Sequence, residues 1–201
     1  FVFEFYGNTV THFIVSKNYL LSFDTSLAGT TLPAGINDNS ALPNALLPDN
    51  TIAYFWDNFA NGTAGLGTND NVWSGVFGTA PNRQFYIKNY SYETGGRGFS
   101  YGHLVLEEST NNIYMIDNYM GGTVGSMTIG AQRNATTAFQ VSGSPNILPI
   151  VTSTAWSALQ YYTLDPRVLV PNDAGTASID NPSAPFSTGA QMVNATIQNF
   201  G

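Results

Sequence analysis

The chain has 201 residues, which is enough for one domain with a sizeable hydrophobic core. Its formal net charge is −7 with only six Lys and Arg residues, which argues against nucleic acid and anionic membranes as partners. There is no cysteine, so disulfides and thiolate sites are excluded, and no apolar run reaches the roughly 18 residues of a membrane span.

The N-terminal part alternates with the period of two that is typical of β-strands. The run FVFEFY at 1–6 is followed by GNT, a hairpin-turn sequence, and residues 10–15 alternate again. Residues 24–50 are rich in Thr, Gly, Asn, Pro and Ala, and they predict a long irregular connection. TIAYFW at 51–56 is a continuous apolar run, which predicts a strand that is buried on both faces.

Short strands follow in quick succession after a second loop. Turn sequences separate them, and no segment shows helical periodicity over 11 or more residues. The predicted strands are 72–77, 83–90, 103–108, 113–117, 126–133 and 138–142. This spacing predicts an all-β fold, an antiparallel β-sandwich that is jelly-roll-like and has long irregular loops.

The composition changes near the C-terminus, where Pro, Asp and Ser become frequent. We therefore predict a β-sandwich domain over residues 1–165 and a C-terminal tail over residues 166–201. Within the tail, QMVNATIQNF at 191–200 alternates once more and predicts a final strand. We expect that strand to add to a sheet edge, either of this chain or of a neighbour.

Five sequence blocks occur in an order that is typical of one domain family. They are FVFEFYGNTVTHFIVSKNYLLSF, LPNALLPDNTIAYFWDNF, GTAPNRQFYIKNY, HLVLEESTNNIYMI and MTIGAQRNAT. The chain resembles an adhesin-type domain of bacterial secreted and cell-surface proteins, especially multidomain proteins exported by the type IX route, and it is distantly similar to nidogen-type extracellular domains. The resemblance implies a β-sandwich, an extracellular or cell-surface location and a non-catalytic role.

One departure from the family pattern concerns a turn. The family has a glycine after the asparagine that corresponds to Asn18, whereas this chain has Tyr19. We expect Asn18 to adopt the positive φ angle in place of that glycine, because asparagine tolerates this conformation better than most residues.

Two residues are interpreted as structural. Arg83 stands where a loop enters a strand, and its fork of donors suits loop carbonyls or a nearby carboxylate, with a sugar- or carboxylate-binding arginine as the alternative. Trp56 ends the apolar run at 51–56 and is expected in the core.

Three kinds of candidate site remain. Asp38, Asp57 and Asp70 could supply oxygen ligands to calcium, although Asx-turns explain the same residues without any cofactor. Trp73 lies beside a loop and is a candidate for stacking on a glycan, with core packing as the alternative. The glycosylation triplet N-x-S/T occurs at Asn61, Asn89, Asn134 and Asn194.

Catalysis is not expected. His12 and His103 both lie in strand-like runs, and no G-x-S-x-G motif is present. Glu107 and Glu108 are neighbours, so on a strand they point to opposite faces and cannot act as a glycosidase pair.

The predicted function is therefore a non-catalytic extracellular or cell-surface module of a bacterial adhesin or secreted protein, serving adhesion or structural presentation. Its expected partners are a surface glycan or protein. Two alternatives stay open: a subunit of an extracellular filament, assembled with neighbouring copies by strand addition, and a carbohydrate-binding module attached to a secreted enzyme.

Overall fold

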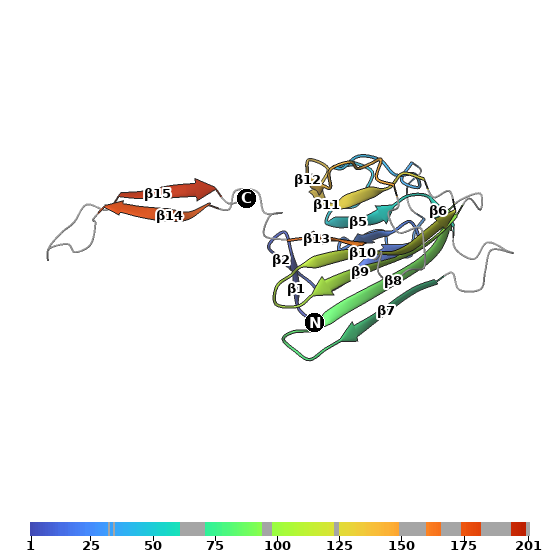
Figure 1. The fold of residues 1–201 in the computed structure, drawn as a ribbon, viewed down its shortest axis with the longest axis horizontal. Helices are drawn as coiled ribbons and strands as arrows, with labels where there is room; N and C mark the ends of the chain where they lie inside the picture. The colour runs from blue at the N-terminus through green and yellow to red at the C-terminus, as the bar shows by residue number, and fades with distance from the viewer. Residues whose placement is uncertain are drawn as a thin grey trace.

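The alternating segments of the sequence form β-strands, whereas the connection of residues 24–50 contains no strand among its described residues (Figure 1). The structure is a computed structural model, and it describes residues 1–31, 33, 35–60, 71–93, 98–122, 125–148, 160–165, 174–181 and 194–199. These residues contain fifteen strands and no helix, which confirms the prediction of an all-β sandwich. None of these residues forms a helix that could cross a membrane.

One layer of the sandwich is a six-stranded antiparallel sheet. Its strands follow the order β13-β10-β9-β8-β6, and β7 also pairs with β8. The hairpin β8–β9 forms the centre of this sheet. It is longer than predicted, because β8 continues to Glu93 and β9 already begins at Gly98. The strands are β6 (Phe59–Ala60), β7 (Asn71–Phe77), β8 (Gln84–Glu93), β9 (Gly98–Glu107), β10 (Ile113–Gly122) and β13 (Gln160–Leu164).

The other layer is a five-stranded antiparallel sheet in the order β12-β11-β5-β4-β3, and a separate hairpin is formed by β1 and β2. The single strand predicted over residues 10–15 is wrong, because residues 11–13 separate β2 from β3. The strands are β1 (Phe3–Phe5), β2 (Asn8–Val10), β3 (Ile14–Ser16), β4 (Leu20–Ser22), β5 (Thr51–Trp56), β11 (Thr128–Asn134) and β12 (Thr137–Gln140).

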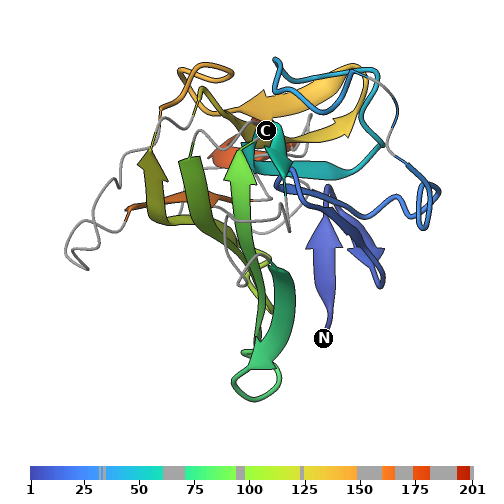
Figure 2. The ribbon, with the colours of Figure 1, turned by 90° about the vertical axis from the view of Figure 1, so that its right-hand side faces the viewer.

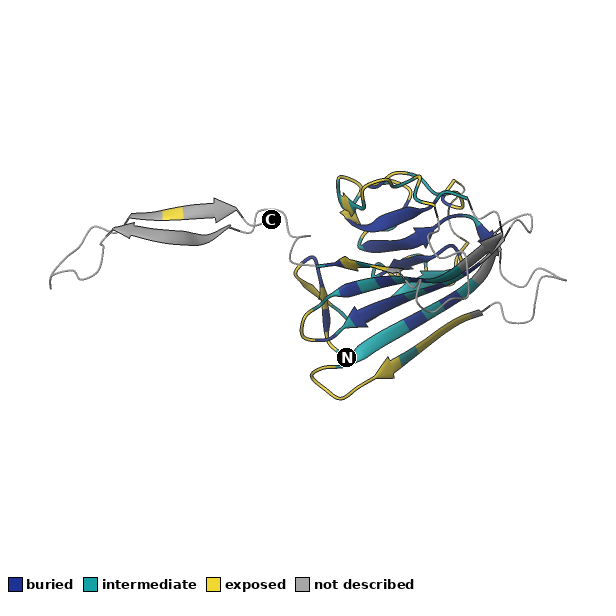
Figure 3. Ribbon diagram, viewed as in Figure 1, coloured by how far each residue is buried: buried dark blue, intermediate teal, exposed yellow. Residues whose placement is uncertain are grey.

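Two hydrophobic clusters lie on either side of the five-stranded sheet, whose strand β5 is buried along its whole length (Figure 3). The larger cluster fills the space between the layers and includes Leu21, Ile52, Ile87, Leu104 and Met115. The smaller cluster lies on the opposite face of that sheet, beneath the long connection of residues 24–50, and consists of Leu20, Ile36, Leu42, Leu47, Ala53 and Trp56. The long connection therefore covers the second core.

A bulge in β5 sets which core each of its last residues joins. All six residues of β5 are buried, as the apolar run predicts. Phe55 has a φ of 96°, and the register with β11 shifts between Thr128 and Ile129. Tyr54 and Phe55 thus both join the core between the layers, while Trp56 turns to the smaller cluster. Its indole Nε1 donates a hydrogen bond to the carbonyl of Ile36 at 3.2 Å.

The turn between β3 and β4 corrects the expectation about Asn18. Tyr19, and not Asn18, has the positive φ, at 60°. The Tyr19 hydroxyl donates to the carbonyl of Asn89 at 2.7 Å and contacts the Ser100 hydroxyl at 2.6 Å, inside the core. A Cβ at Gly102 would lie 2.5 Å from the Tyr19 ring, so this glycine makes room for it. Buried hydrogen bonds of this kind offset the strain of the backbone.

The tail forms a hairpin of its own. Within the predicted strand at 191–200, residues Asn194–Asn199 form β15, which pairs antiparallel with β14 (Ala174–Asn181) in a two-stranded sheet. Its partner among the described strands is therefore the preceding strand of the tail, and its addition to another sheet edge, of this chain or of a neighbour, stays a prediction.

Candidate functional site

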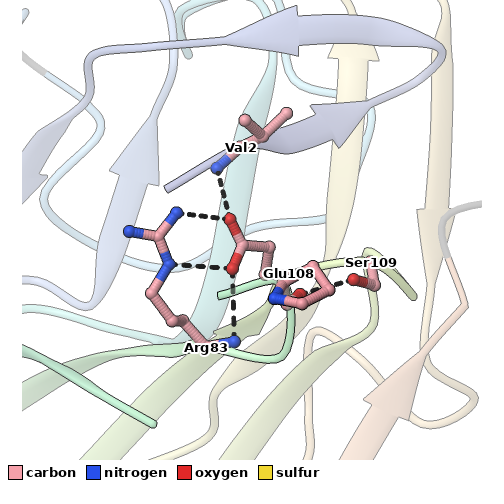
Figure 4. Close-up of polar contacts among 5 residues, drawn as sticks. Val2, Arg83, Glu108 and Ser109 are labelled. Atoms are coloured by element: carbon pink, nitrogen blue, oxygen red, sulfur yellow. Dashed lines mark hydrogen bonds and ion pairs between the residues drawn. The ribbon is translucent and has the colours of Figure 1, made fainter. Parts of the chain in front are cut away.

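Arg83 takes part in a clamp that holds the N-terminus against the six-stranded sheet (Figure 4). Its guanidinium donates to both carboxylate oxygens of Glu108, from Nε at 2.8 Å and from Nη2 at 2.5 Å. The Val2 amide donates to the same carboxylate at 3.2 Å, and the Arg83 guanidinium lies 5.9 Å from the Phe1 ring centroid. The arginine is thus occupied by the protein itself.

The clamp follows from the register of β8 and β9. Gln84 is opposite Glu107 at the end of this pairing, so Arg83 and Glu108 are the next residues on each strand. Hydrogen bonds from Arg83 and from the Val2 amide lower the pKa of Glu108 to about 2. The carboxylate is therefore charged at neutral pH, and the site is a bidentate ion pair that joins three chain segments.

The opposite face of the same sheet carries a set of tyrosines. Residues paired across neighbouring strands point to the same face, so Tyr90, Tyr101 and Tyr119 form a row across β8, β9 and β10. Their ring centroids are separated by 4.3 Å and 6.0 Å along the row. We call this surface the tyrosine face and define it by Tyr86, Tyr90, Tyr101, Tyr114, Tyr119 and Tyr161.

A shallow hollow of about 250 Å³ lies within the tyrosine face. Its walls carry three phenol rings and one amide, from Tyr86, Tyr114, Tyr161 and Gln84, and its floor includes Val105. Tyr161 is 66% exposed, whereas Val105 is only 2% exposed beneath the rings. The hollow therefore offers aromatic surface and hydroxyl groups together.

Glu107 lies next to this hollow and is held by a hydrogen-bond network. It accepts hydrogen bonds from Thr110 at 2.7 Å, from Gln84 at 3.2 Å and from the Tyr114 hydroxyl at 3.2 Å. The bond from Thr110 is the largest cause of the lowered pKa of Glu107, so the carboxylate is charged at neutral pH. Glu107 and Glu108 thus serve opposite faces, as the strand alternation predicts.

Trp73 lies on β7, at the margin of the same face. It is opposite Lys88 in the pairing with β8, and it is 46% exposed. A Cβ at Gly75 would lie 2.4 Å from the indole, so the ring covers the backbone of its own strand there. The ring centroids of Phe77 and Trp73 are 6.1 Å apart, and Phe77 is 52% exposed.

A second cavity lies on the other layer. It has a volume of about 550 Å³ and lies between the β3–β4 edge of the five-stranded sheet and residues 27–31. Its lining includes Ser16, Lys17, Asn18, Ser22, Thr30 and Thr51, and no carboxylate side chain lies among the lining residues that the structure describes.

The candidate calcium ligands are only partly described. Asp38 is exposed on the long connection, Asp57 is buried after β5, and Asp70 lies outside the described residues. Within the described ranges, no group of three or more His, Asp or Glu side chains is placed to hold a metal ion.

The glycosylation triplets fall in different environments. Asn89 is fully buried, and its amide donates to the carbonyl of Lys17 at 3.2 Å, which leaves no space for a glycan in the folded domain. Asn134 is half-buried at the end of β11. Asn61 lies outside the described residues, and the side chain of Asn194 on β15 is also not described.

The two histidines are found in different settings. His12 is exposed and contacts the Thr11 hydroxyl, whereas His103 lies on the tyrosine face beside Tyr90. Burial, and next the charge of Lys88, lower the pKa of His103, which is therefore neutral at pH 7.

The hollow and its neighbour Glu107 were not found by sequence reasoning, although a signal existed. Tyrosines alternate on β8 at Tyr86 and Tyr90, and on β10 Tyr114 occupies the same face. Alternation places them on one face, but only the register shows that they are adjacent.

The model of a family described as NIDO related matches residues 1–166. Neither the curated proteins nor the solved structures gave a match. The family match covers most of the chain and includes the clamp, both sheets and the tyrosine face. The chain therefore belongs to the NIDO-related family.

Proposed function

We propose that this chain is a non-catalytic extracellular module of a secreted or cell-surface protein, and that it serves adhesion or structural presentation through its tyrosine face. NIDO-related domains are typically extracellular, which supports the location. A bacterial adhesin exported by the type IX route is the parent protein that the sequence blocks favour.

The observation that carries this proposal is the exposure of aromatic rings on an ordered sheet. Tyr161 is 66% exposed, Trp73 is 46% exposed, and both lie on one face of the six-stranded sheet. Tyrosine and tryptophan supply large, rigid contact area with a polar group at its edge, and they are enriched where proteins bind partners. Neither hydrophobic cluster of the described residues includes a side chain of the tyrosine face.

A carbohydrate-binding module is the second candidate, and the hollow favours it. Sugar rings present apolar C–H groups that pack on aromatic faces, together with hydroxyl groups that need hydrogen-bond partners. Tyr114 and Tyr161 supply the first kind of contact, while Gln84 and Glu107 supply the second kind at the same position. The ligand class that this combination suits is a neutral glycan, because the nearby carboxylate would repel an anionic one.

The filament alternative depends on strand addition by the tail. β15 already has one edge paired with β14, so a donor strand would have to use its other edge or leave the hairpin. This pairing makes the filament the weaker candidate of the three.

Binding to surfaces tests the main proposal. The 201-residue chain is labelled and applied to a glycan array and to surfaces coated with mucin or with extracellular matrix proteins. We expect binding on at least one of these surfaces, and we expect Tyr161→Ala to reduce it at least tenfold, since exposed aromatic residues dominate binding energies.

The matched control is Leu148→Ala, which removes an apolar side chain of similar exposure, 65%, outside the tyrosine face. We expect this variant to bind like the unchanged chain. Equal loss in both variants, or binding that Tyr161→Ala leaves intact, would show that the tyrosine face is not the contact surface. If Glu107→Gln loses binding to glycans but keeps binding to the protein-coated surfaces, the carbohydrate-binding candidate is favoured.

A further inference from the structure

We propose that β7 is a self-association edge: two copies of this chain pair antiparallel through β7 about a two-fold axis at Ser74. The two six-stranded sheets then form one continuous sheet. This inference does not rest on the proposed function, because it concerns the edge of the sheet and not the tyrosine face.

The first observation is that one side of β7 has no partner among the described residues. β7 pairs with β8 along its whole length, from Asn71 opposite Tyr90 to Phe77 opposite Gln84, and no described strand pairs with its other side. Figures 1 and 2 show it at the margin of the sheet. Such an edge presents a row of backbone N–H and C=O groups that can pair with another chain.

The second observation is that β7 lacks the features with which proteins protect such edges. The run NVWSGVF contains no proline and no charged residue. Its register with β8 shows no bulge, so the edge is regular over seven residues. Proteins usually prevent edge-to-edge pairing with lysine, proline or a β-bulge. β7 has none of these features, so its free edge is open to pairing with another strand.

The third observation is that apolar side chains are exposed on both faces of β7. Val72 and Val76 are 41% and 47% exposed on the face toward the core, and Trp73 and Phe77 are similarly exposed on the opposite face. In Figure 3, β7 is the strand of this sheet that is mostly coloured as exposed. A partner strand would cover part of both faces at once, which a ligand bound to one face would not do.

The sequence of β7 specifies a second copy as the partner. With Ser74 on the two-fold axis, Val72 of one copy lies opposite Val76 of the other, and Trp73 lies opposite Gly75. The valine pair is β-branched and apolar, a favourable cross-strand combination. Gly75 is already covered by the Trp73 ring of its own strand, so the two Trp73–Gly75 pairs add no further side chain at the seam.

The charge distribution permits contact between two copies at this edge. The chain carries a net charge of −7, so two copies repel each other at long range. The edge itself has no charge, and the repulsion is screened within about 8–10 Å at physiological salt. A strand of seven residues is roughly 23 Å long, which gives a smaller contact than a standard interface, so we expect monomer and dimer to exchange with concentration.

The molecular mass in solution gives the first test. Light scattering and sedimentation are measured from micromolar to millimolar chain concentration. The unchanged chain should rise from 21.6 kDa toward twice that mass, and Val76→Lys should stay at 21.6 kDa, because it places a charge at the seam. Leu148→Lys is the matched control, since it makes the same change at an exposed apolar residue outside β7, and it should dimerise normally.

Disulfide trapping tests the register independently, because the chain has no cysteine of its own. Ser74→Cys places a thiol opposite its own copy and should give a covalent dimer under mild oxidation. In Val72→Cys, the thiols of the two copies are four residues apart along the seam, which is roughly 13 Å. This distance is too long for a disulfide, so the variant should not cross-link. A monomeric unchanged chain, a Val76→Lys variant that still dimerises, or equal cross-linking of Ser74→Cys and Val72→Cys would each overturn the proposal.

Discussion

At the scale of single residues, Glu108 shows how one carboxylate can organise several segments. It binds the Arg83 guanidinium in a bidentate manner, and it also accepts hydrogen bonds from the amides of Arg83 and Val2. The result connects the N-terminal strand to the end of the β8–β9 hairpin (Figure 4). Arg83 therefore contributes to the scaffold.

The clamp predicts a specific pH dependence of stability. The pKa of Glu108 is about 2 in the folded chain, compared with an ordinary value of 4.5. A carboxyl with a lower pKa in the folded state stabilises the fold above pH 4.5, and this contribution is lost as the pH falls from 4.5 toward 2. Glu108→Gln should therefore lower the melting temperature at pH 7, and the difference from the unchanged chain should narrow below pH 4.5.

The control for that experiment is Glu4→Gln, which removes one negative charge from an exposed carboxylate. Thermal unfolding is followed by circular dichroism from pH 7 to pH 2.5. A constant difference between Glu108→Gln and the unchanged chain over this range would contradict the ion-pair explanation.

Trp56 gives a second prediction at this scale. Its side chain is fully buried in the smaller cluster, and its indole is hydrogen-bonded to the long connection. Trp56→Ala should destabilise the fold by about 3–5 kcal/mol, through lost burial and the cavity that remains. Trp56→Phe keeps much of the apolar volume and should lose much less. Denaturant titrations measure both values, and an unchanged midpoint for Trp56→Ala would contradict the assignment.

At the scale of elements, pairing decides which segments belong to the sandwich. β13 pairs with β10 and so belongs to the six-stranded sheet, whereas β14 and β15 pair only with each other among the described strands. A strand that shares no ladder with the sheets contributes nothing to them through backbone hydrogen bonds. The hairpin β14–β15 is therefore a separate element of the tail (Figure 1).

This separation predicts the result of truncation. A chain that ends at residue 165 keeps every strand of both sheets, and it should melt at the same temperature as the full chain, within about 2 °C. Differential scanning calorimetry of the two chains measures this directly. A clearly lower melting temperature after truncation would show that the tail packs on the sandwich.

At the scale of the whole molecule, the two layers share a core, and the long connection encloses a second one on the outer side of the five-stranded sheet. The opposite outer side of the sandwich carries the tyrosine face. The protein thus has one outer face covered by its own chain and one that presents aromatic side chains.

The all-strand architecture predicts a spectrum. Less than about a tenth of the residues should be helical, well below the usual helical third. Far-ultraviolet circular dichroism should show a β-type spectrum, and a dominant helical signal would contradict the fold.

The sequence by itself determined the local properties of this protein. Alternation and turn residues predict the all-β class, because side chains on a strand point to opposite faces with a period of two. The apolar run at 51–56 predicts a strand buried on both faces, which the structure confirms. The same local rule places Glu107 and Glu108 on opposite faces.

Only the tertiary structure decided which of these residues meet. Contacts between residues far apart in the chain determine four features that the sequence did not reveal. These are the partner of Arg83, the positive φ of Tyr19, the tyrosine row and the pairing of β15. Strand order and register set these contacts, and a bulge such as the one at Phe55 changes the side to which later residues point. A local pattern carries no information on register between distant strands, so the clamp and the hollow became visible only in the folded chain.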